Sequence, residues 1–507
     1  MSLLDPDVVA DYTARGWWGT RTLSELVRDR ALTTPVATAY VTPSATTSWA
    51  EYDELANRFA TALVKRGVQP GDRVAVLLPD DERVHAALLA TERVGAVAVG
   101  LGWRAGAQEV EHLVRRTGAA LAVTTAGRDV PVPAVRAEEL PPAGEVDLAP
   151  LGPNDLWLLN STSGTTGVPK VVTQFQNRWF RFLKHAVDAG GLGDDEVLMS
   201  VIPAPFGFGL WTAHVAGTVL GAPTVVLPRF DVEQMVRLIE RERVTVLCCV
   251  STQFRMLLNA PASHDADLSS LRVMFTGGEM IPPERAAEFE ERTGAVVLSF
   301  FGSNESGAFT VTRRDDPREK RLTTVGRPIP EMHLRLYDDS GADVTATGRG
   351  IPGGHGPLAC AGYWDDDAAN AQLYAPDGAM LMGDVVELDA EGYVRVVGRQ
   401  SDIVIRGGKN ISAVQVETEV DTHPAVDQVG IVAVPDVVFG ERVCAVVTLV
   451  PGATLTLDEL AAHLLARGLG KELLPEHLLV LDDLPRSSGG KLAKGELRRI
   501  AAERLVP

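Results

Sequence analysis

The sequence predicts an α/β protein: a large N-terminal domain of doubly wound, mixed sheets, followed by a smaller α+β domain. Two observations carry this prediction. Over about the first 300 residues, buried-looking apolar runs alternate with amphipathic helical segments, which is the rhythm of β-α-β units and of parallel sheets. Beyond about residue 320, short strands punctuated by Gly and Asp take over, and a fresh mixture of helices and strands then runs to the end.

The N-terminal part contains the clearest β-α-β unit. Residues 23–30 and 52–66 carry apolar side chains at helical spacing, so we expect both segments to be amphipathic helices. Residues 73–78 resemble a buried strand, 81–94 a helix and 95–100 the next strand. Strands joined by a helix in this way lie parallel in one sheet.

The middle of the chain continues this pattern. Further strands are expected at residues 197–202, 224–227, 244–249, 273–276 and 296–300. Glycine-rich turns occur after several of the strands, at 206–209, 277–279 and 302–307. In doubly wound sheets, ligands bind beyond the carboxyl ends of the strands. We therefore expect these three turns to converge on one site.

A hairpin pattern closes the large domain. Residues 383–388 and 393–397 alternate as two strands around a polar turn, and the polar, glycine-led segment 398–402 follows directly. We place the domain boundary there, with residues 1–398 in the large domain and residues 399–507 in the small one.

Composition disfavours several classes of function. The chain has 507 residues, of which 45% are hydrophobic and 23% charged, an ordinary balance for a globular multidomain protein. Its net charge of −19 disfavours nucleic acid and anionic membranes as partners, because both need dense positive surface. It shows neither a signal-peptide pattern nor an apolar run of the roughly 20 residues that a membrane helix needs. We expect a cytoplasmic protein.

Metal-binding residue types are scattered along the chain. Cys248, Cys249, Cys360 and Cys444 include one adjacent pair but no Cys-x-x-Cys motif. Neither disulfides nor a zinc site is therefore indicated, and we expect reduced, mostly buried thiols. The ten histidines show no ligand spacing. A catalytic transition metal is not expected.

The most informative stretch is 160–170, which reads Asn-Ser-Thr-Ser-Gly-Thr-Thr-Gly-Val-Pro-Lys after an apolar run. It combines hydroxyl groups, glycines and a lysine: Ser161, Thr162, Ser163, Gly164, Thr165, Thr166, Gly167 and Lys170. Glycines let successive backbone N–H groups turn towards an anion, hydroxyl groups donate further hydrogen bonds or hold Mg²⁺, and the lysine adds positive charge. The stretch therefore predicts a phosphate-binding loop.

This loop differs from the common nucleotide-binding loop, which needs Gly, four residues and then Gly-Lys-Ser/Thr. Two residues separate Gly164 from Gly167, and two more precede Lys170, so a kinase or GTPase is not indicated. The stretch resembles the phosphate loop of the adenylate-forming superfamily, which includes acyl-CoA ligases, stand-alone adenylation enzymes and luciferases. The resemblance covers nearly the whole chain, with its motifs in the family's order. It implies a small β-barrel-like part in the large domain, a mobile small domain, and ATP as a substrate.

A second stretch, 300–307, also resembles the family. Glu305 is the main candidate ligand for Mg²⁺, which prefers oxygen ligands such as carboxylates and phosphates, and Thr165 is the other. The resemblance implies further nucleotide contacts around these turns, from Gly277, Gly278, Glu279, Ser299, Phe301, Gly302, Ser303 and Asn304. Relatives usually carry Thr or Ala where this chain has Asn304.

Two more motifs imply contacts to the nucleotide sugar and a mobile catalytic lysine. By resemblance, the Asp384 carboxylate binds the ribose hydroxyls, and Arg399 also reaches the sugar. Lys491 lies in a glycine turn near the C-terminus. The resemblance implies that it swings in to the substrate carboxylate and the α-phosphate, where its charge stabilises the anionic transition state. Together with Lys170 and Glu305, it completes the implied catalytic set.

The small domain is implied to rotate between two half-reactions. Ser401 occupies the hinge position, where relatives usually have Lys or Asp. Gly407 and Gly408 resemble the turn that lines the pantetheine tunnel for CoA. Two further departures from the family are Gln176, where many relatives have His, and Met382, where Thr or Tyr is common. By resemblance, Met382 and Asn304 replace residues that face the nucleotide, so these departures point to a weakened adenylation half-reaction.

The acid-binding pocket is expected to be aromatic and uncharged. By resemblance its wall comprises Phe206, Gly207, Phe208, Trp211, Cys249, Val250, Ser251 and Phe300. Amino-acid-activating relatives place Asp at the position of Gly207 to pair the substrate ammonium, and catechol-activating relatives place Asn there for a ring hydroxyl. Gly207 offers neither group and leaves room, so a bulky, largely apolar acid fits best.

These features predict an acyl-CoA ligase that uses a small-molecule carboxylic acid, ATP, Mg²⁺ and CoA. Three alternatives stay open: an adenylation enzyme that loads a carrier protein, a ligase that retains mainly thioesterification, and a non-catalytic nucleotide-binding homologue. Retention of Lys170, Glu305, Asp384, Arg399 and Lys491 disfavours the last. No nucleic acid or membrane partner is expected. The sequence leaves open the identity of the acid and whether the protein is a homodimer.

Overall fold

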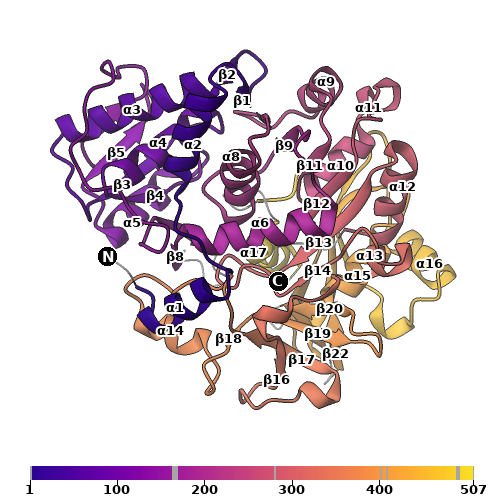
Figure 1. The fold of residues 1–507 in the computed structure, drawn as a ribbon. Coiled ribbons are helices and arrows are strands. Elements are labelled where there is room, and N and C mark those ends of the chain that lie inside the picture. Colours follow the sequence, from indigo (N-terminus) through magenta and orange to yellow (C-terminus); the bar gives the residue numbers. More distant parts are fainter. Residues whose placement is uncertain are drawn as a thin grey trace. The chain divides into compact units, whose positions relative to one another are not determined.

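The computed structural model describes residues 3–162, 170–278, 281–399, 402–406, 409–486 and 492–505 (Figure 1). These residues divide into two compact units. The first contains the described residues up to 334 together with 354–380, and the second contains 335–353 and the described residues from 381 onward. The domain boundary expected at residues 398 and 399 stays a prediction.

The first unit is rich in helices, most of which are labelled in Figure 1. Their bounds are α1 (Pro6–Ala14), α2 (Leu23–Thr33), α3 (Trp49–Lys65), α4 (Glu82–Arg93), α5 (Ala107–Thr117), α6 (Gln176–Gly190), α7 (Gly207–Gly209), the π-helix η1 (Leu210–Ala216), α8 (Gly217–Leu220), α9 (Val232–Glu242), α10 (Ser251–Asn259), α11 (Ala262–Asp265), α12 (Pro283–Thr293), α13 (Arg318–Thr323), the 3₁₀-helix η2 (Pro330–Met332) and α14 (Asp367–Leu373). Capping boxes formed by Thr22 with Glu25 and by Ser48 with Glu51 begin α2 and α3. The helices expected at residues 23–30 and 52–66 are confirmed as α2 and α3.

A six-stranded sheet forms the N-terminal part of the first unit. Its spatial order is β6 (Ala134–Arg136), β5 (Leu121–Thr124), β3 (Arg73–Leu77), β4 (Val97–Gly100), β7 (Leu158–Thr162) and β8 (Lys170–Gln174). All neighbours are parallel except β7 and β8, which are antiparallel. Apolar side chains of α5 pack on those of β3 and β4. The predicted strand–helix–strand unit is confirmed by β3, α4 and β4.

A nine-stranded sheet forms the rest of the first unit's framework. Its order is β15 (Arg327–Pro328), β14 (Thr310–Val311), β13 (Val296–Phe301), β12 (Val273–Gly277), β11 (Val246–Cys248), β9 (Leu198–Ser200), β10 (Thr224–Val226), β1 (Thr38–Val41) and β2 (Thr46–Ser48). The strands from β13 to β1 are parallel, and the outer ones are antiparallel. All five strands predicted in the middle of the chain belong to this parallel part.

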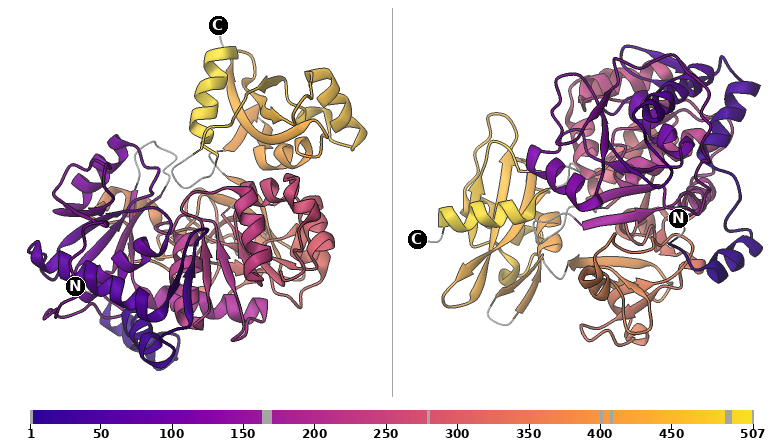
Figure 2. Two further views of the ribbon diagram at one scale, coloured as in Figure 1. Left: turned by 90° about the horizontal axis from the view of Figure 1, so that it is seen from above. Right: turned by 90° about the vertical axis from the view of Figure 1, so that its left-hand side faces the viewer.

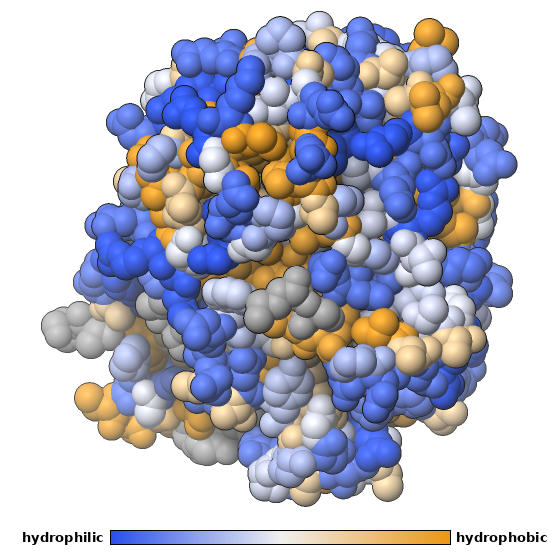
Figure 3. All heavy atoms as spheres, turned by 60° about the vertical axis from the view of Figure 1, so that its left-hand side comes forward, coloured by the Kyte–Doolittle hydropathy of each residue, from blue (hydrophilic) through white to orange (hydrophobic). Residues whose placement is uncertain are grey.

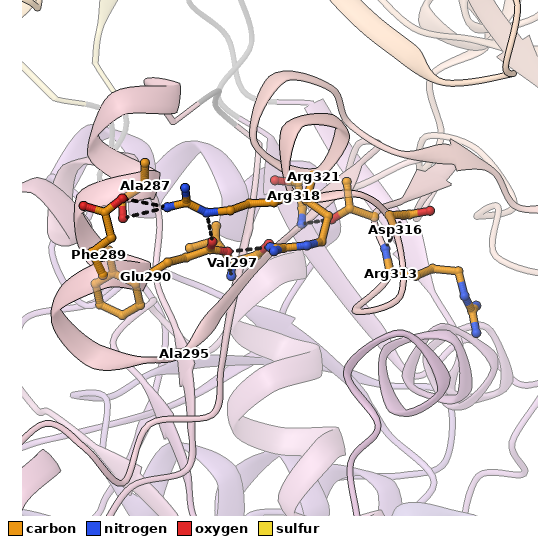
Figure 4. A network of polar contacts seen from close by, with 12 residues as sticks. Ala287, Phe289, Glu290, Ala295, Val297, Arg313, Asp316, Arg318 and Arg321 are labelled. Carbon is orange, nitrogen blue, oxygen red and sulfur yellow. Dashed lines mark hydrogen bonds and ion pairs between the residues drawn. The ribbon is translucent and has the colours of Figure 1, made fainter.

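Ion pairs fix β13, which leads into one of the expected site turns. Figure 4 shows Glu290 of α12 between Arg318 and Arg321 of α13. Glu290 also accepts a hydrogen bond from the Val297 N–H at 3.0 Å. Burial alone would raise the pKa of Glu290, but the bonds from Arg321, Val297 and Arg318 outweigh it and lower the pKa. The carboxylate therefore ties both helices to the strand.

The second unit contains two smaller sheets. Its elements are β16 (Arg335–Tyr337), the 3₁₀-helix η3 (Thr345–Thr347), β17 (Arg349–Gly354), β18 (Met380–Leu381), β19 (Asp384–Leu388), β20 (Val394–Arg399), β21 (Ile403–Arg406), β22 (Lys409–Ser412), α15 (Ala413–Val420), β23 (Val426–Asp436), β24 (Gly440–Leu449), α16 (Leu457–Ala466), the 3₁₀-helix η5 (Lys471–Leu473), β25 (His477–Val480) and α17 (Lys494–Leu505). β16 to β20 form one sheet and β21 to β25 the other. The predicted hairpin is β19 and β20. In Figure 2, α17 is the yellow helix near the C-terminus; its Leu497 and Ala501 pack on Val432 and Val434 of β23.

Hydrophilic side chains predominate on the face shown in Figure 3, and apolar ones appear there in separate patches. Within the described ranges, no helix is both long and apolar enough to cross a membrane. All four cysteines are free and buried, as predicted. The described residues also contain no group of three or more His, Cys, Asp or Glu side chains that could hold a metal ion.

Candidate active site

Two of the turns expected to converge do lie together beyond the carboxyl ends of the strands. The link between them is Asn160 on β7. Its Nδ2 donates hydrogen bonds to the Pro205 carbonyl at 2.8 Å and to Asn304 Oδ1 at 3.3 Å. Pro205 directly precedes the turn 206–209, and Asn304 lies in the turn 302–307. Strand ends from two different sheets thus meet at one place, and ligands of doubly wound sheets bind beyond such carboxyl ends.

Three carboxamide side chains form a closed cluster at this place. Gln174 Nε2 donates to Asn160 Oδ1 at 2.9 Å and to Asn304 Oδ1 at 3.0 Å. Asn304 Nδ2 donates back to Asn160 Oδ1 at 2.8 Å. Asn160 and Gln174 are fully buried and do not reach water, so the cluster supplies hydrogen-bond partners for their polar groups. It fixes the orientation of the Asn304 side chain.

A buried arginine on α6 holds this cluster and the turn together. The Arg178 guanidinium donates to Gln174 Oε1 at 2.6 Å and to the carbonyls of Asn304, Glu305 and Leu358 at 3.1, 3.0 and 2.7 Å. Burial lowers the pKa of Arg178 to about 10, so the side chain stays protonated near neutral pH. Its hydrogen bonds therefore carry a full positive charge to the backbone of the turn.

The place beside Gly207 is occupied by Asn304. A Cβ atom at Gly207 would lie 2.7 Å from Asn304 Oδ1 and 3.2 Å from the Trp179 ring. The room expected beside this glycine is therefore filled by the carboxamide that the cluster holds. Any side chain at position 207 would have to displace Asn304.

Aromatic rings cluster next to this position. Trp211 lies 5.0 Å from Phe182, 5.6 Å from Phe208 and 5.7 Å from Phe300, measured between ring centroids. Trp211 and Phe300 are buried, whereas Phe206 and Phe208 are partly exposed. Three of the predicted pocket residues, Phe208, Trp211 and Phe300, therefore form one aromatic region with Phe182.

The other predicted pocket residues lie at the ends of β11 and β12. Cys249 is fully buried in the hydrophobic core, with its Sγ 3.6 Å from Met274 Sδ, and burial raises its pKa. Val250 and Ser251 begin α10 and are also buried. Gly277 ends β12 close to Phe300: an added Cβ would lie 3.0 Å from the Phe300 carbonyl oxygen. For Cys249, packing in the core accounts for the contacts observed.

The turn 302–307 owes its shape to small residues. A Cβ atom at Gly302 would lie 1.9 Å from the Gly307 carbonyl oxygen, so only glycine fits there. Ser303 Oγ accepts hydrogen bonds from the N–H groups of Glu305 and Ser306, at 3.2 and 3.1 Å. Ser303 thus shapes the loop itself. Just before the turn, the Ser299 N–H donates to Thr312 Oγ1.

Glu305, the candidate Mg²⁺ ligand, lies in a charged group with Tyr363 and Lys170. The Tyr363 hydroxyl donates to Glu305 Oε1 at 2.7 Å, and Lys170 Nζ lies over the Tyr363 ring, 4.9 Å from its centroid. Burial and the adjacent Glu305 carboxylate raise the pKa of Tyr363, so its hydroxyl remains a donor. Glu305 is only 9% exposed. An acid, a phenol and a lysine thus share one small region.

The nucleotide-sugar candidates belong to the second unit. Asp384 on β19 is paired directly with Arg399 on β20 in the antiparallel register, so the two residues are cross-strand neighbours. Asp384 is buried. Met382 is also buried, and its N–H donates to the Pro352 carbonyl at 2.9 Å.

Several predicted site residues lie outside the described residues: Ser163, Gly164, Thr165, Thr166, Gly167, Glu279, Ser401, Gly407, Gly408 and Lys491. The side chains of Thr162 and Arg399 also fall outside the description, whereas Ser161 is buried on β7. The roles assigned to all of these residues stay predictions.

Sequence reasoning did not single out Gln174, Arg178 or Tyr363 as parts of the site. One signal for Arg178 was available, because this cation directly precedes Trp179 and lies one helical turn before Phe182, on the side that the helix buries. Gln176 was noted as a departure from the family, but its Oε1 accepts from the Leu23 N–H at 2.7 Å. That side chain therefore serves the start of α2.

Family models match both parts of the chain. The model described as AMP-binding enzyme matches residues 27–364, and the model described as AMP-binding enzyme C-terminal domain matches residues 415–491. Together they cover most of the sequence, and the two matches follow each other without overlap.

Individual relatives match over almost their whole length. A feruloyl-CoA synthase from an Amycolatopsis species is 34% identical over 93% of this chain and 97% of its own. A 2-hydroxy-7-methoxy-5-methyl-1-naphthoate–CoA ligase from Streptomyces carzinostaticus is 32% identical over 98% and 96%. A solved o-succinylbenzoate CoA synthetase from Bacillus subtilis, in complex with its acyl-adenylate intermediate, superimposes with a TM-score of 0.83 at 26% identity, covering 93% of this chain and 97% of that one.

Proposed function

Because the chain belongs to the AMP-binding enzyme family, we propose that it is an AMP-forming acid–thiol ligase that makes the CoA thioester of a bulky, largely apolar carboxylic acid. In the first step, a carboxylate oxygen of the acid attacks the α-phosphorus of ATP, and pyrophosphate leaves. In the second step, the CoA thiol loses its proton and attacks the acyl carbon of the adenylate, and AMP leaves.

One observation carries this proposal: two adjacent residues of the turn 302–307 lie beside different surfaces, one aromatic and suited to the acid, the other charged and suited to the phosphates. Asn304 faces Gly207 and the aromatic region. Glu305, the next residue, lies in the charged group with Tyr363 and Lys170. An apolar acid held by the aromatic region would present its carboxylate towards the charged group. Fixed charges aimed at the reacting phosphate are the main means by which such enzymes lower the barrier.

The acid side of the site supports an aryl or polycyclic substrate. Phe208 is partly exposed and offers its ring to a flat substrate, and the buried Trp211 ring packs against both Phe208 and Phe300. Position 207 carries no charged side chain, so a substrate ammonium group would be left without a partner there. The relatives that act on feruloyl and naphthoate groups agree with this substrate class.

The charged side of the site fits ATP with Mg²⁺. Glu305 Oε1 accepts the Tyr363 hydrogen bond, and no described residue bonds to the second oxygen, Oε2, which suits the preference of Mg²⁺ for carboxylate oxygens. Bound Mg²⁺ would neutralise charge on the phosphates. Lys170 would contribute positive charge to the same phosphates. The roles of Thr165 as a second metal ligand and of the loop 161–167 as the phosphate cradle belong to this proposal.

The second unit would supply the remaining functions. Asp384 and Arg399, neighbours across a strand pair, suit the two hydroxyls of a ribose. Lys491 would stabilise adenylate formation, and the turn with Gly407 and Gly408 would line the path of CoA. Rotation of the small domain at Ser401 would exchange these two functions between the steps.

CoA is the favoured thiol, because the relatives above are named CoA ligases or CoA synthetases. A carrier protein is the alternative acceptor, and homodimer formation is left open. The four buried, free thiols fit the reducing environment of the cytoplasm.

A substrate panel tests the proposal. Aryl, alicyclic and polycyclic acids are each incubated with ATP, Mg²⁺ and either CoA or a carrier protein bearing the phosphopantetheine arm, and mass spectrometry follows the adenylate and the thioester. We expect an aryl or polycyclic acid to give adenylate and then the CoA thioester. The Glu305→Gln variant should give far less of both from acid and ATP. Adenylate without CoA thioester, but with acylated carrier protein, would overturn the choice of CoA.

A further inference from the structure

Tyr363 reaches the charged group because its segment runs along the edge of the six-stranded sheet. Residues 362–364 lie beside β8: Tyr363 bridges Val172 in an antiparallel sense, and the Trp364 N–H donates to the Val171 carbonyl at 2.7 Å. Lys170 is two residues before Val172 and therefore lies on the same side of β8. Such diagonal neighbours across a strand pair are within reach of long side chains. The sheet edge thus brings Tyr363 to Lys170.

The backbone of Tyr363 is held on both sides by one residue of α14. Asn370 Oδ1 accepts a hydrogen bond from the Tyr363 N–H at 2.8 Å, and Asn370 Nδ2 donates to the Tyr363 carbonyl at 2.9 Å. The same segment also touches the turn 302–307, because the Cys360 N–H donates to the Glu305 carbonyl at 2.7 Å. A side chain placed by this many backbone contacts has little freedom to move.

Tyr363 offers a different group to each of its charged neighbours. Its hydroxyl donates to the Glu305 carboxylate, and its ring face lies under the Lys170 ammonium group. The two contacts use separate parts of the side chain. Removing the hydroxyl alone would therefore affect Glu305, and removing the ring would affect both.

We propose that Tyr363 is a positioning residue that sets the Glu305 carboxylate and the Lys170 ammonium group for Mg²⁺ and the phosphates of ATP. Its hydroxyl occupies Oε1 of Glu305 and so directs Oε2 towards the metal. Its ring keeps the Lys170 ammonium group beside the carboxylate without direct pairing to it. This inference rests on the proposed function, since it assigns ATP·Mg²⁺ to this group.

The test measures binding rather than turnover. The full-length protein is titrated with α,β-methylene ATP, whose α,β bridge blocks adenylation, in an isothermal calorimeter with either Mg²⁺ or EDTA. The ratio of the two affinities is the Mg²⁺ increment. Tyr363→Phe should lower the increment about tenfold, the scale of a hydrogen bond to a charged group, and should leave the affinity in EDTA unchanged. Tyr363→Leu should also weaken binding in EDTA, about threefold, because Lys170 loses the ring.

Tyr374→Phe is the matched control. Tyr374 packs in the same small apolar cluster as Tyr363, whereas the phenol that donates to the Glu305 carboxylate is that of Tyr363. We expect the control to keep the wild-type increment and the wild-type melting temperature. A purely structural role for Tyr363 would instead weaken binding equally with Mg²⁺ and with EDTA.

The outcomes separate this inference from the proposed function. If the wild-type protein does not bind the ATP analogue at all, the proposed function fails and the inference fails with it. If the wild type binds the analogue but Tyr363→Phe keeps the full Mg²⁺ increment, the inference alone is overturned. An increment absent from the wild type would likewise overturn the inference, because Glu305 would then not hold the metal.

Discussion

Acid should destabilise the first unit through a buried pair of histidines, and the effect can be isolated with one substitution. His85 on α4 and His214 on η1 are fully buried and stack with centroids 5.3 Å apart, between Tyr40 and Trp157. Among the described residues, neither imidazole has a hydrogen-bond partner. Burial lowers the pKa of His214 from 6.5 to about 3 and also lowers that of His85, which His214 depresses further.

The sign of the effect follows from proton uptake. In the unfolded chain His214 binds a proton below about pH 6.5, whereas in the folded protein it stays neutral down to about pH 3. With respect to His214, the free energy of unfolding therefore keeps its full value above the pKa of the unfolded state. It decreases as the pH falls below that pKa. For a fall from about pH 7.5 to about pH 5, the difference in proton binding by His214 alone amounts to about 2 kcal/mol of the free energy of unfolding.

Two buried carboxyl groups act in the opposite direction, so the wild-type protein alone is not informative. Burial raises the pKa values of Asp80 and Glu92 to about 7, and each therefore stabilises the fold as the pH falls. Asp80 and Glu92 contribute equally to the pH dependence of wild type and of His214→Phe, because both proteins contain them. The difference between the two proteins therefore reports on His214. Phenylalanine keeps a flat ring between His85 and Trp157 and carries no titrating nitrogen.

Urea unfolding followed by tryptophan fluorescence provides the assay. All eight tryptophans belong to the first unit, so the signal reports that unit. We expect the wild type to lose about 2 kcal/mol more than His214→Phe between the two pH values. An equal loss in both proteins would show that His214 is protonated in the folded state and would refute the reasoning.

Two further predictions concern Lys491, the proposed catalytic lysine, and a buried arginine. Lys491→Ala should lower the rate of adenylate formation by at least about 10²-fold, the scale for removing one charge-stabilising group. Thioester formation from a supplied adenylate should be spared. Equal losses in both steps would contradict a role confined to adenylation. Arg178→Met leaves three backbone carbonyls without their charged donor and should cost about 3 kcal/mol or more in urea unfolding. Lys184→Met, an exposed change on the same helix, is the control, and an equally small cost for both would contradict the structural role of Arg178.

Periodic apolar patterns predicted the framework well. The strand expected at 73–78 is β3 (Arg73–Leu77), and the helix expected at 81–94 is α4 (Glu82–Arg93). Burial of one helix face or of a whole strand leaves a repeat in the sequence, and that repeat survives without knowledge of the neighbours. The ends differ by a residue or two because caps and turns, rather than periodicity, set them.

The internal supports of the site could not be predicted in the same way. Asn160 and Asn304 are 144 positions apart, and their hydrogen bond depends on the relative placement of two sheets. Tyr363 reaches Glu305 only because its segment adds to the edge of β8. Contacts of this kind leave no local pattern. The turns themselves were predictable, because the carboxyl ends of parallel strands lie at the same edge of the sheet.

The position of Asn304 changes the meaning of its departure from the family. Relatives usually carry Thr or Ala there, and from the sequence this departure, together with Met382, pointed to weakened nucleotide contacts and to a ligase that retains mainly thioesterification. In the structure the Asn304 carboxamide is held by Asn160 and Gln174 and fills the place beside Gly207. The departure therefore lies beside Gly207, in the proposed acid pocket, and we expect both half-reactions to be retained.

The final prediction follows from that placement. Asn304→Thr should change kcat/KM for the best acid about tenfold or more relative to other acids, because it opens the wall beside Gly207, and should leave the KM for ATP within about twofold. Gly207→Ala should be impaired alone, because its Cβ meets Asn304 Oδ1 at 2.7 Å, and should recover in part when combined with Asn304→Thr. Pyrophosphate release, measured for each variant with the best acid, checks both points. If the wild type instead releases little pyrophosphate with every acid but converts a prepared acyl-adenylate and CoA to thioester readily, Asn304 acts on the nucleotide after all, and the enzyme retains mainly the second half-reaction.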